Sequence, residues 1–331
     1  MENNQIMMKE KLVLFGILKE TLTILYKNPS FIILTFLTSL PLFCSLLAHE
    51  IIFQQTLIET AKFLPQEDSY KERCSVSADG VSLCWYQVID PLDTIKEMID
   101  KVTVRYLLLG LSYVGIVHLL DLFSTIVIVN SASVIYAGEK RMNLKERWHR
   151  SIEGVSLKGP LITSIYALLM SSLSLLGLVS LVTQFYMISR AILITIFFGL
   201  LLSIAWLAKH MEWNAIWNMG VVMSVLEEKQ GVIALGVSAY VSRGCRRRGL
   251  FLMLIFFVWR LALRLSCLYV GWSEGGSGIV VTAVQVSLVC FGNVLKWVAF
   301  MVYFYDCKKR FLEKKVDVEQ GSAADRSSEI N

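Results

Sequence analysis

Long apolar stretches alternate with shorter polar ones along nearly the whole chain. A helix needs about 20 mostly apolar residues to cross a bilayer whose hydrocarbon core is about 30 Å thick. Six stretches reach or approach that length: residues 31–53, 106–136, 160–182, 191–208, 250–270 and 279–305. The pattern predicts an all-α integral membrane protein with about six transmembrane helices.

Two further segments have helical periodicity but are too polar to span. Residues 1–30 predict an amphipathic helix at the membrane surface, with one apolar face formed by Met7, Leu14, Leu18, Leu22 and Leu25. Residues 209–249 begin with tryptophans at helical spacing and end in arginines, which is typical of a second interfacial segment. Residues 54–105 form the long loop on the other side, and the polar tail 306–331 is expected to be disordered.

Composition supports the membrane assignment, and the distribution of charge orients it. The chain has 331 residues, of which 55% are hydrophobic, and a mean hydropathy of +0.57. With the N-terminus inside, the four inward segments hold 4, 6, 6 and 6 Lys or Arg, and the three outward segments hold 6, 1 and 0. The six lie in the long loop 54–105, where the rule is weakest. The positive-inside rule therefore favours both termini in the cytoplasm. The endoplasmic reticulum or the plasma membrane is the expected location.

A short motif lies in the segment 209–249. It consists of Trp217, Glu227, Gly231, Ala234, Leu235, Ser238 and Gly244. Glu227 is expected to end one helix, Gly231 to let the chain reverse, and the small residues to lie on one face of the next helix.

These residues resemble a motif of the six-helix membrane domain fused to some bacterial glycerophosphodiester phosphodiesterases, and of its stand-alone bacterial and plant relatives. Val237 and Ala239 depart from the family pattern, which often has a basic and an aromatic residue there. The chain has no room for the roughly 250 residues of a phosphodiesterase (β/α) barrel. The resemblance therefore implies a fold, and no activity.

Six polar residues inside the predicted spans form a candidate cluster, and each Asp, Arg or Lys there costs roughly 2.5–3.5 kcal/mol unless it finds a partner or water. They are His118, Asp121, Arg260, Arg264, Asn293 and Lys296. Asp121, Arg260 and Asn293 come out near the same depth, and we expect Asp121 to pair with Arg260. Such a cluster serves either as a structural ion pair between spans or as a polar site for a solute or proton.

Two other groups of residues suggest contacts outside the spans. Arg243, Arg246, Arg247 and Arg248 are placed to bind anionic lipid head groups, or simply to fix the topology. Cys74 and Cys84 are the cysteines of the outward loop, and they form either a disulfide or two free thiols.

No nucleotide-binding, hydrolase or metalloprotease motif occurs, so neither an enzyme, a cofactor nor a metal is expected. The basic residues follow the topology and give no support for nucleic-acid binding. The interpretation that follows is a multi-pass membrane protein acting through contacts with membrane lipids or other membrane proteins. The alternative is a small-solute or ion transporter that uses the polar cluster.

Overall fold

The computed structural model describes residues 2–63, 71–76, 82–87, 104–137, 157–188, 193–227, 229–273 and 278–328. The predicted outward loop therefore falls largely outside the described residues, as does most of the inward loop between the second and third spans.

Almost all of the described chain is helical. The long helices are α1 (Glu2–Lys27), α2 (Pro29–Phe63), α4 (His118–Tyr136), α6 (Lys158–Ile188), α7 (Leu193–Leu226), α9 (Arg246–Ser273) and α10 (Gly278–Ser328). The shorter elements are a π-helical turn η1 (Tyr113–Val117), the helix α8 (Gly231–Val241), a 3-10 turn η3 (Ser242–Gly244), and the strands β1 (Lys71–Val76) and β2 (Ser82–Gln87).

Five helical segments of the described chain are long and apolar enough to cross a membrane. They are Pro29–Leu57, Val104–Tyr136, Lys158–Phe185, Arg246–Ser266 and Ile279–Glu313. The helical membrane architecture expected from the hydropathy pattern is thus compatible with the structure. The sixth predicted span, 191–208, falls in α7 and is not among these five segments. It continues without a break to Leu226, so the first half of the predicted interfacial segment 209–249 belongs to the same helix.

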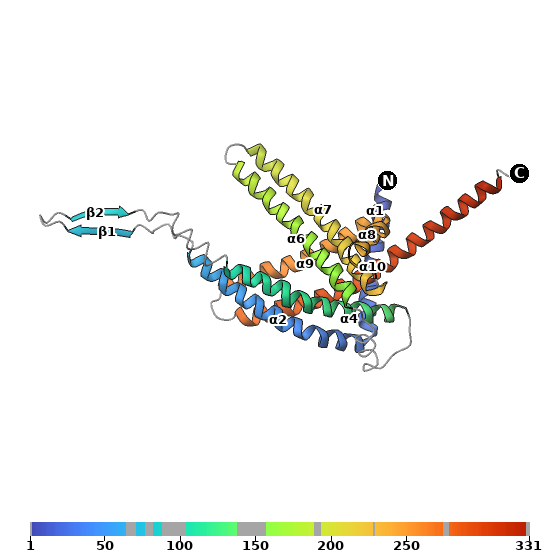
Figure 1. The fold of residues 1–331 in the computed structure, drawn as a ribbon, viewed down its shortest axis with the longest axis horizontal. Coiled ribbons are helices and arrows are strands. Elements are labelled where there is room, and N and C mark those ends of the chain that lie inside the picture. Colours follow the sequence, from blue (N-terminus) through green and yellow to red (C-terminus); the bar gives the residue numbers. More distant parts are fainter. Residues whose placement is uncertain are drawn as a thin grey trace.

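The helices α2, α4, α9 and α10 run together as a bundle (Figure 1), and the core lies where α4, α9 and α10 meet α1 and the second half of α7. The middle of α10 supplies its largest buried side chains, including Phe300, Met301, Tyr303 and Phe304. The helices α6 and α7 pack on each other as a hairpin that leaves this bundle at an angle (Figure 1). The most apolar stretch of α6 has no buried residue, as expected of a helix that faces lipid tails.

Helix α1 packs against α10 with most of the face predicted from the sequence, since Leu25 is buried and Leu14 and Leu18 pack against the core. Ile17, Thr21, Ile24 and Leu25 are buried, whereas Leu22, placed on the apolar face by its periodicity, is 56% exposed. Thr21 lies within the buried stripe, and its hydroxyl donates to the carbonyl of Ile17 at 2.8 Å. A polar residue can therefore occupy the centre of the contact.

The motif around Gly231 forms a helix–turn–helix between α7 and α8. Gly231 has φ +57°, a left-handed conformation that favours glycine, and its N–H donates to Thr163 Oγ1 of α6 at 2.9 Å. Ala234 and Ser238 are buried on the face of α8 that meets α7, and the Ser238 hydroxyl bonds the Ile216 carbonyl at 3.1 Å. These geometric roles agree with those expected from the sequence.

The predicted disordered tail 306–331 is helical as far as Ser328, because α10 continues past the membrane-spanning part. Charge pairs one turn apart support this extension. Arg310 bonds Asp306 at 3.2 Å, and Lys309 lies 3.9 Å from Glu313. Such pairs at i,i+4 stabilise an exposed helix. The polar composition of the tail suggested disorder, because composition does not take the spacing of the charges into account.

The strands β1 and β2 form an antiparallel pair that the sequence analysis did not predict. In its register Cys74 lies directly opposite Cys84. The hairpin lies beyond the end of α2 (Figure 1), and we call this end of the bundle, where α10 begins at Gly278, the β-hairpin end.

Candidate functional site

The polar residues predicted within the spans come together in the bundle. His118 and Asp121 begin α4, Arg260 lies on α9, and Asn293 and Lys296 lie on α10. All five line one cavity of about 70 Å³. The π-helical turn η1 immediately precedes His118. Its wider turn shifts the register of the helix just before His118 and Asp121, and such turns often occur at functional sites.

Two larger cavities adjoin this central one. The first, about 290 Å³, shares His118, Asp121, Arg260 and Lys296 with it and extends between the bundle and the α6–α7 hairpin. The second, about 430 Å³, lies toward the β-hairpin end and shares Arg260 with the central cavity, together with Leu46, Tyr113 and Val289. Arg260 lines all three. We call them the central, inner and end cavities.

The predicted Asp121–Arg260 ion pair is not formed in the described part of the chain. The Asn293 amide instead donates to Asp121 Oδ1 at 2.7 Å, which joins α4 to α10. Asp121 and Arg260 nevertheless line the central and inner cavities together. The three residues line one cavity, but their positions in the sequence do not say which donor reaches the carboxylate.

His118 is held by a residue that the sequence analysis did not single out. Its Nε2 lies 2.7 Å from Ser164 Oγ of α6, so the imidazole connects the bundle to the α6–α7 hairpin. Ser164 also lines the inner cavity, as do Asn214 and Asn218 of α7. These three are uncharged, and serine and asparagine in an apolar helix carry no distinctive sequence signal.

Three hydrogen-bond donors at the central and inner cavities lack an acceptor within the described residues. Arg260 makes no ion pair or hydrogen bond there. The Lys296 ammonium makes a cation–π contact, 4.1 Å from the centroid of the Trp297 ring. Trp297 is 5% exposed and its Nε1 is buried without a partner. Since the indole nitrogen can only donate, its missing partner must be an acceptor.

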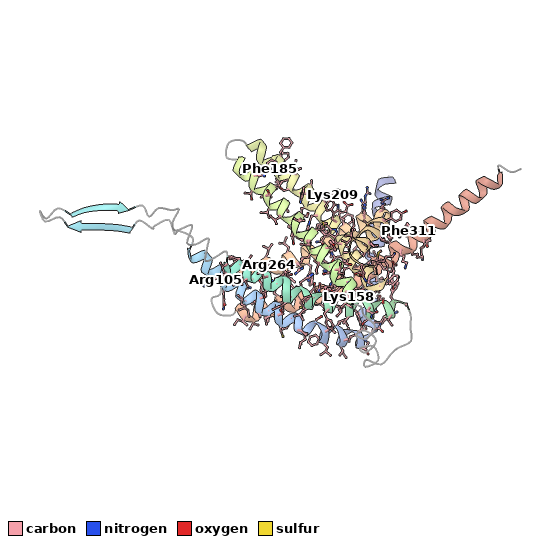
Figure 2. All side chains as sticks on the ribbon, in the orientation of Figure 1. Arg105, Lys158, Phe185, Lys209, Arg264 and Phe311 are labelled. Carbon is pink, nitrogen blue, oxygen red and sulfur yellow. The ribbon has the colours of Figure 1, made fainter. Side chains whose placement is uncertain are left out.

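Arg264 lies apart from this cluster, at the β-hairpin end of the bundle (Figure 2). It faces Glu50 of α2 at 3.9 Å, and its guanidinium lies 5.1 Å from the centroid of the Phe53 ring. The end cavity also contains Gln285 of α10, whose Oε1 is buried without a hydrogen-bond partner in the described chain.

The arginines predicted to bind lipid head groups surround a separate cavity of about 450 Å³ at the start of α9. Arg248 bonds Asp306 at 2.8 Å, and Arg246 lies 3.6 Å from Glu212. Arg243 stacks over the Tyr240 ring at 5.0 Å. Arg246 and Arg248 are thus paired with carboxylates, which weakens the cluster as an anion site and strengthens it as a joint between α7, α9 and α10.

The remaining motif residues have structural contacts. Glu227 accepts from Lys308 of α10 at 2.7 Å and faces Lys229 at 3.0 Å. Burial raises the pKa of this carboxyl, but the hydrogen bonds from Lys308 and Lys229 outweigh it, so the pKa lies below its ordinary value. Trp217 stacks edge-to-face on Trp213 and lines the inner cavity, and Leu235 approaches Gly220. A side chain on Gly244 would meet open space.

The described residues contain no group of three His, Cys, Asp or Glu side chains placed to hold a metal ion. The central and inner cavities thus combine three donors without an acceptor, Arg260, Lys296 and Trp297, with one carboxylate, Asp121, that already accepts a hydrogen bond from Asn293. This arrangement suits a ligand that carries negative charge or several acceptor oxygens.

The fold and the cavities define the chain as a helical protein compatible with a membrane location, with a polar site lined by residues of its long helices. It belongs to the family described as Domain of unknown function (DUF8558), whose profile matches residues 1–322. No curated protein matches the chain. No solved structure matches it either.

Proposed function

We propose that this protein is a membrane carrier for a small anionic solute, bound at the central and inner cavities by Arg260, Lys296 and Trp297. The observation that carries the proposal is that these three donors meet at connected cavities without an acceptor of their own. An arginine inside a membrane is costly unless it pairs or meets water, so an uncommitted one marks a functional site.

The charge balance supports an anion over a cation. The central cavity is lined by two cations and one carboxylate, and that carboxylate is already hydrogen-bonded by Asn293. An entering cation would face Arg260 and Lys296 with a single committed carboxylate to offset them. An anion would satisfy the guanidinium, the ammonium and the indole N–H together.

The shared lining residues support transport rather than binding alone. The end cavity meets the central one at Arg260 and Val289, and the central cavity meets the inner one at Asp121 and Lys296. The three cavities thus follow one another from the β-hairpin end toward the α6–α7 hairpin. A solute could move along this series without leaving the neighbourhood of a cation.

A second candidate function is a membrane scaffold that acts through lipid or protein contacts, without catalysis. The Asn293–Asp121 bond favours it, because this bond holds α4 against α10 as a structural contact would. The proposal retains the orientation with both termini in the cytoplasm, in the endoplasmic reticulum or plasma membrane, and the relation to the phosphodiesterase-linked membrane domains. Support for these comes from the charge pattern and the motif alone.

Charge-selective labelling tests the carrier proposal. A single cysteine is placed at Val289, which lines the central and end cavities, in a background without the 7 native cysteines. It is then labelled in membranes with two thiosulfonate reagents of similar size, one carrying a sulfonate and one a trimethylammonium group. We expect the sulfonate reagent to react about tenfold faster, equivalent to about 1.4 kcal/mol.

Val284→Cys is the matched control, because Val284 lies on the same helix, is 55% exposed and does not line these cavities. Arg260→Gln should remove the preference at position 289 and leave position 284 unchanged. Protection of the Val289→Cys thiol from both reagents would mean a sealed structural cluster and would support the scaffold instead. Equal rates with Arg260 in place would refute the anionic solute.

A further inference from the structure

We infer that the end cavity is a separate entry site for a small carboxylate that carries a hydrogen-bond donor on its α-carbon, with Arg264 binding the carboxylate and Gln285 accepting from the donor. The inference rests on the proposed function, since this cavity leads to the central one. It names the class of solute, which the central site leaves open.

The cation of this site is only loosely held by the protein. Arg264 Nη2 lies 3.9 Å from Glu50 Oε1, which is too long for a hydrogen bond, and its side chain is 48% exposed. Phe53 provides the ring beneath the guanidinium at 5.1 Å. An aromatic ring fixes the plane of the guanidinium while its N–H groups stay available, and a planar fork of donors fits a carboxylate.

Glu50 occupies the position near Arg264 that the carboxylate of a solute would take. It lies on α2, is 16% exposed, and is the carboxylate that the described chain brings near Arg264. A small carboxylate can approach Arg264 to hydrogen-bond distance and displace Glu50 from it. Glu50 therefore competes with the solute, so removing its charge should strengthen binding.

Gln285 indicates what else the solute carries. Its Oε1 is buried without a donor in the described chain, and a buried acceptor left unpaired costs about 1–3 kcal/mol. Gln285 lines the same cavity as Arg264 and Glu50. An ammonium group beside the carboxylate would supply this donor but would leave the solute without net charge. A hydroxyl group there would supply the donor, recover that energy and keep the solute an anion. A simple carboxylate would supply no donor.

The experiment compares three probes of one carbon skeleton on the purified full-length protein in detergent. They are propanoate, 2-hydroxypropanoate and alanine, titrated at constant ionic strength while the midpoint of thermal unfolding is recorded. A ligand that binds the folded state raises this midpoint with concentration. At least one donor-bearing probe should half-saturate at a concentration roughly threefold or more below propanoate. The better of the two shows whether the donor is a hydroxyl or an ammonium.

The variants assign the effect to the site. Gln285→Met keeps the side-chain length and should abolish the difference between the donor-bearing probes and propanoate. Arg264→Gln should raise the half-saturating concentration about tenfold, whereas Glu50→Gln should lower it. Arg243→Gln, at the separate arginine cavity, is the control and should change nothing.

Equal half-saturation for all three probes, or a difference that survives Gln285→Met, would overturn the inference. The same holds if Glu50→Gln weakens binding.

The two proposals fail separately. Loss of the sulfonate preference at position 289 contradicts the central anion site, whereas a normal preference there with no discrimination among the three probes contradicts the entry site alone.

Discussion

An arginine in a membrane helix is defined by what satisfies its guanidinium. Arg248 faces a carboxylate at 2.8 Å, and Arg243 has a tyrosine ring. Arg260 has neither among the described residues, although it lines three adjoining cavities. These arginines differ in whether the protein itself supplies a partner for the guanidinium. Arg260 is therefore available to a ligand, whereas the others make contacts within the fold.

A glycine, Gly231, allows the chain to reverse its direction between α7 and α8. Gly231 has φ +57°, and a Cβ there would lie 3.2 Å from Ile162 Cγ2. Gly231→Ala should therefore destabilise the protein by about 1–2 kcal/mol, the cost of a left-handed residue with a side chain. The midpoint of thermal unfolding in detergent measures it.

Gly236→Ala is the matched control, because Gly236 lies within α8 and a Cβ there would meet nothing within 4 Å. Alanine is the better helix former, so this variant should be neutral or slightly more stable. If both alanine variants lower the midpoint equally, the left-handed turn is not what fixes this reversal.

Residues with charge or an unusual backbone could be predicted from the sequence, and uncharged partners could not. Asp121, Arg260 and Asn293 stand out because such side chains are rare in spans, and Gly231 because a turn was needed there. Ser164 and Trp297 are ordinary membrane residues whose importance depends on the neighbour they meet or lack. That information lies in the packing of α6 and α10 on α4.

At the scale of elements, one ion-paired joint connects α7 and α8 to α10. Glu227 follows the end of α7 and accepts from Lys308 of α10 at 2.7 Å. Glu227→Gln keeps the shape and removes the charge, so it should cost roughly 1 kcal/mol for a partly exposed pair. Glu313→Gln, which removes an exposed pair within α10 itself, is the control and should cost less.

The same joint predicts a pH dependence. The folded-state pKa of Glu227 lies below its ordinary value of 4.5, so its ionised form is stabilised by folding. This contribution is fully present above about pH 4.5 and is lost as the pH falls through the lower folded value. The difference in unfolding midpoint between wild type and Glu227→Gln should therefore shrink on acidification below pH 4.5. A difference that stays constant there would contradict the ion pair.

The strand pair supports a disulfide between Cys74 and Cys84, which the sequence left open. Residues directly opposite in an antiparallel pair have Cα atoms about 4.5–5.5 Å apart, within the range that a disulfide bridges. We expect protein from membranes, alkylated without reductant, to carry two fewer alkyl groups than reduced protein, and Cys74→Ser to abolish this difference. Full alkylation of both thiols without reductant would contradict the disulfide and would also count against an outward location of the loop.

The positions of helices could be predicted where hydropathy alone sets them. The predictions were wrong where a helix also depends on contacts or charge pairs outside its apolar stretch. Hydropathy placed the apolar parts of α2, α4, α6, α9 and α10. It cannot mark the end of a helix that continues into water, which is why α7 and α10 run on to Leu226 and Ser328. Periodicity predicted the buried face of α1 in part, since Leu14, Leu18 and Leu25 pack on the core whereas Leu22 is exposed.

For the whole molecule, the bundle and the α6–α7 hairpin diverge (Figure 1), and the inner cavity is lined from both. His118 and Ser164 connect the two parts by one hydrogen bond. A carrier must expose its site to each side in turn, and the part of the hairpin best placed to move is the most apolar stretch of α6, which has no buried residue. The whole-molecule proposal therefore rests on the same cavities as the residue-scale argument.

The most direct measurement is uptake of labelled ethanesulfonate, a permanently charged small anion, into vesicles reconstituted with the purified protein. The account predicts saturable uptake above protein-free vesicles, at least tenfold lower for Arg260→Gln, reduced for Trp297→Phe, and unchanged for the control Arg243→Gln. Uptake equal to that of protein-free vesicles, or equal in wild type and Arg260→Gln, would contradict an anion carrier built around Arg260.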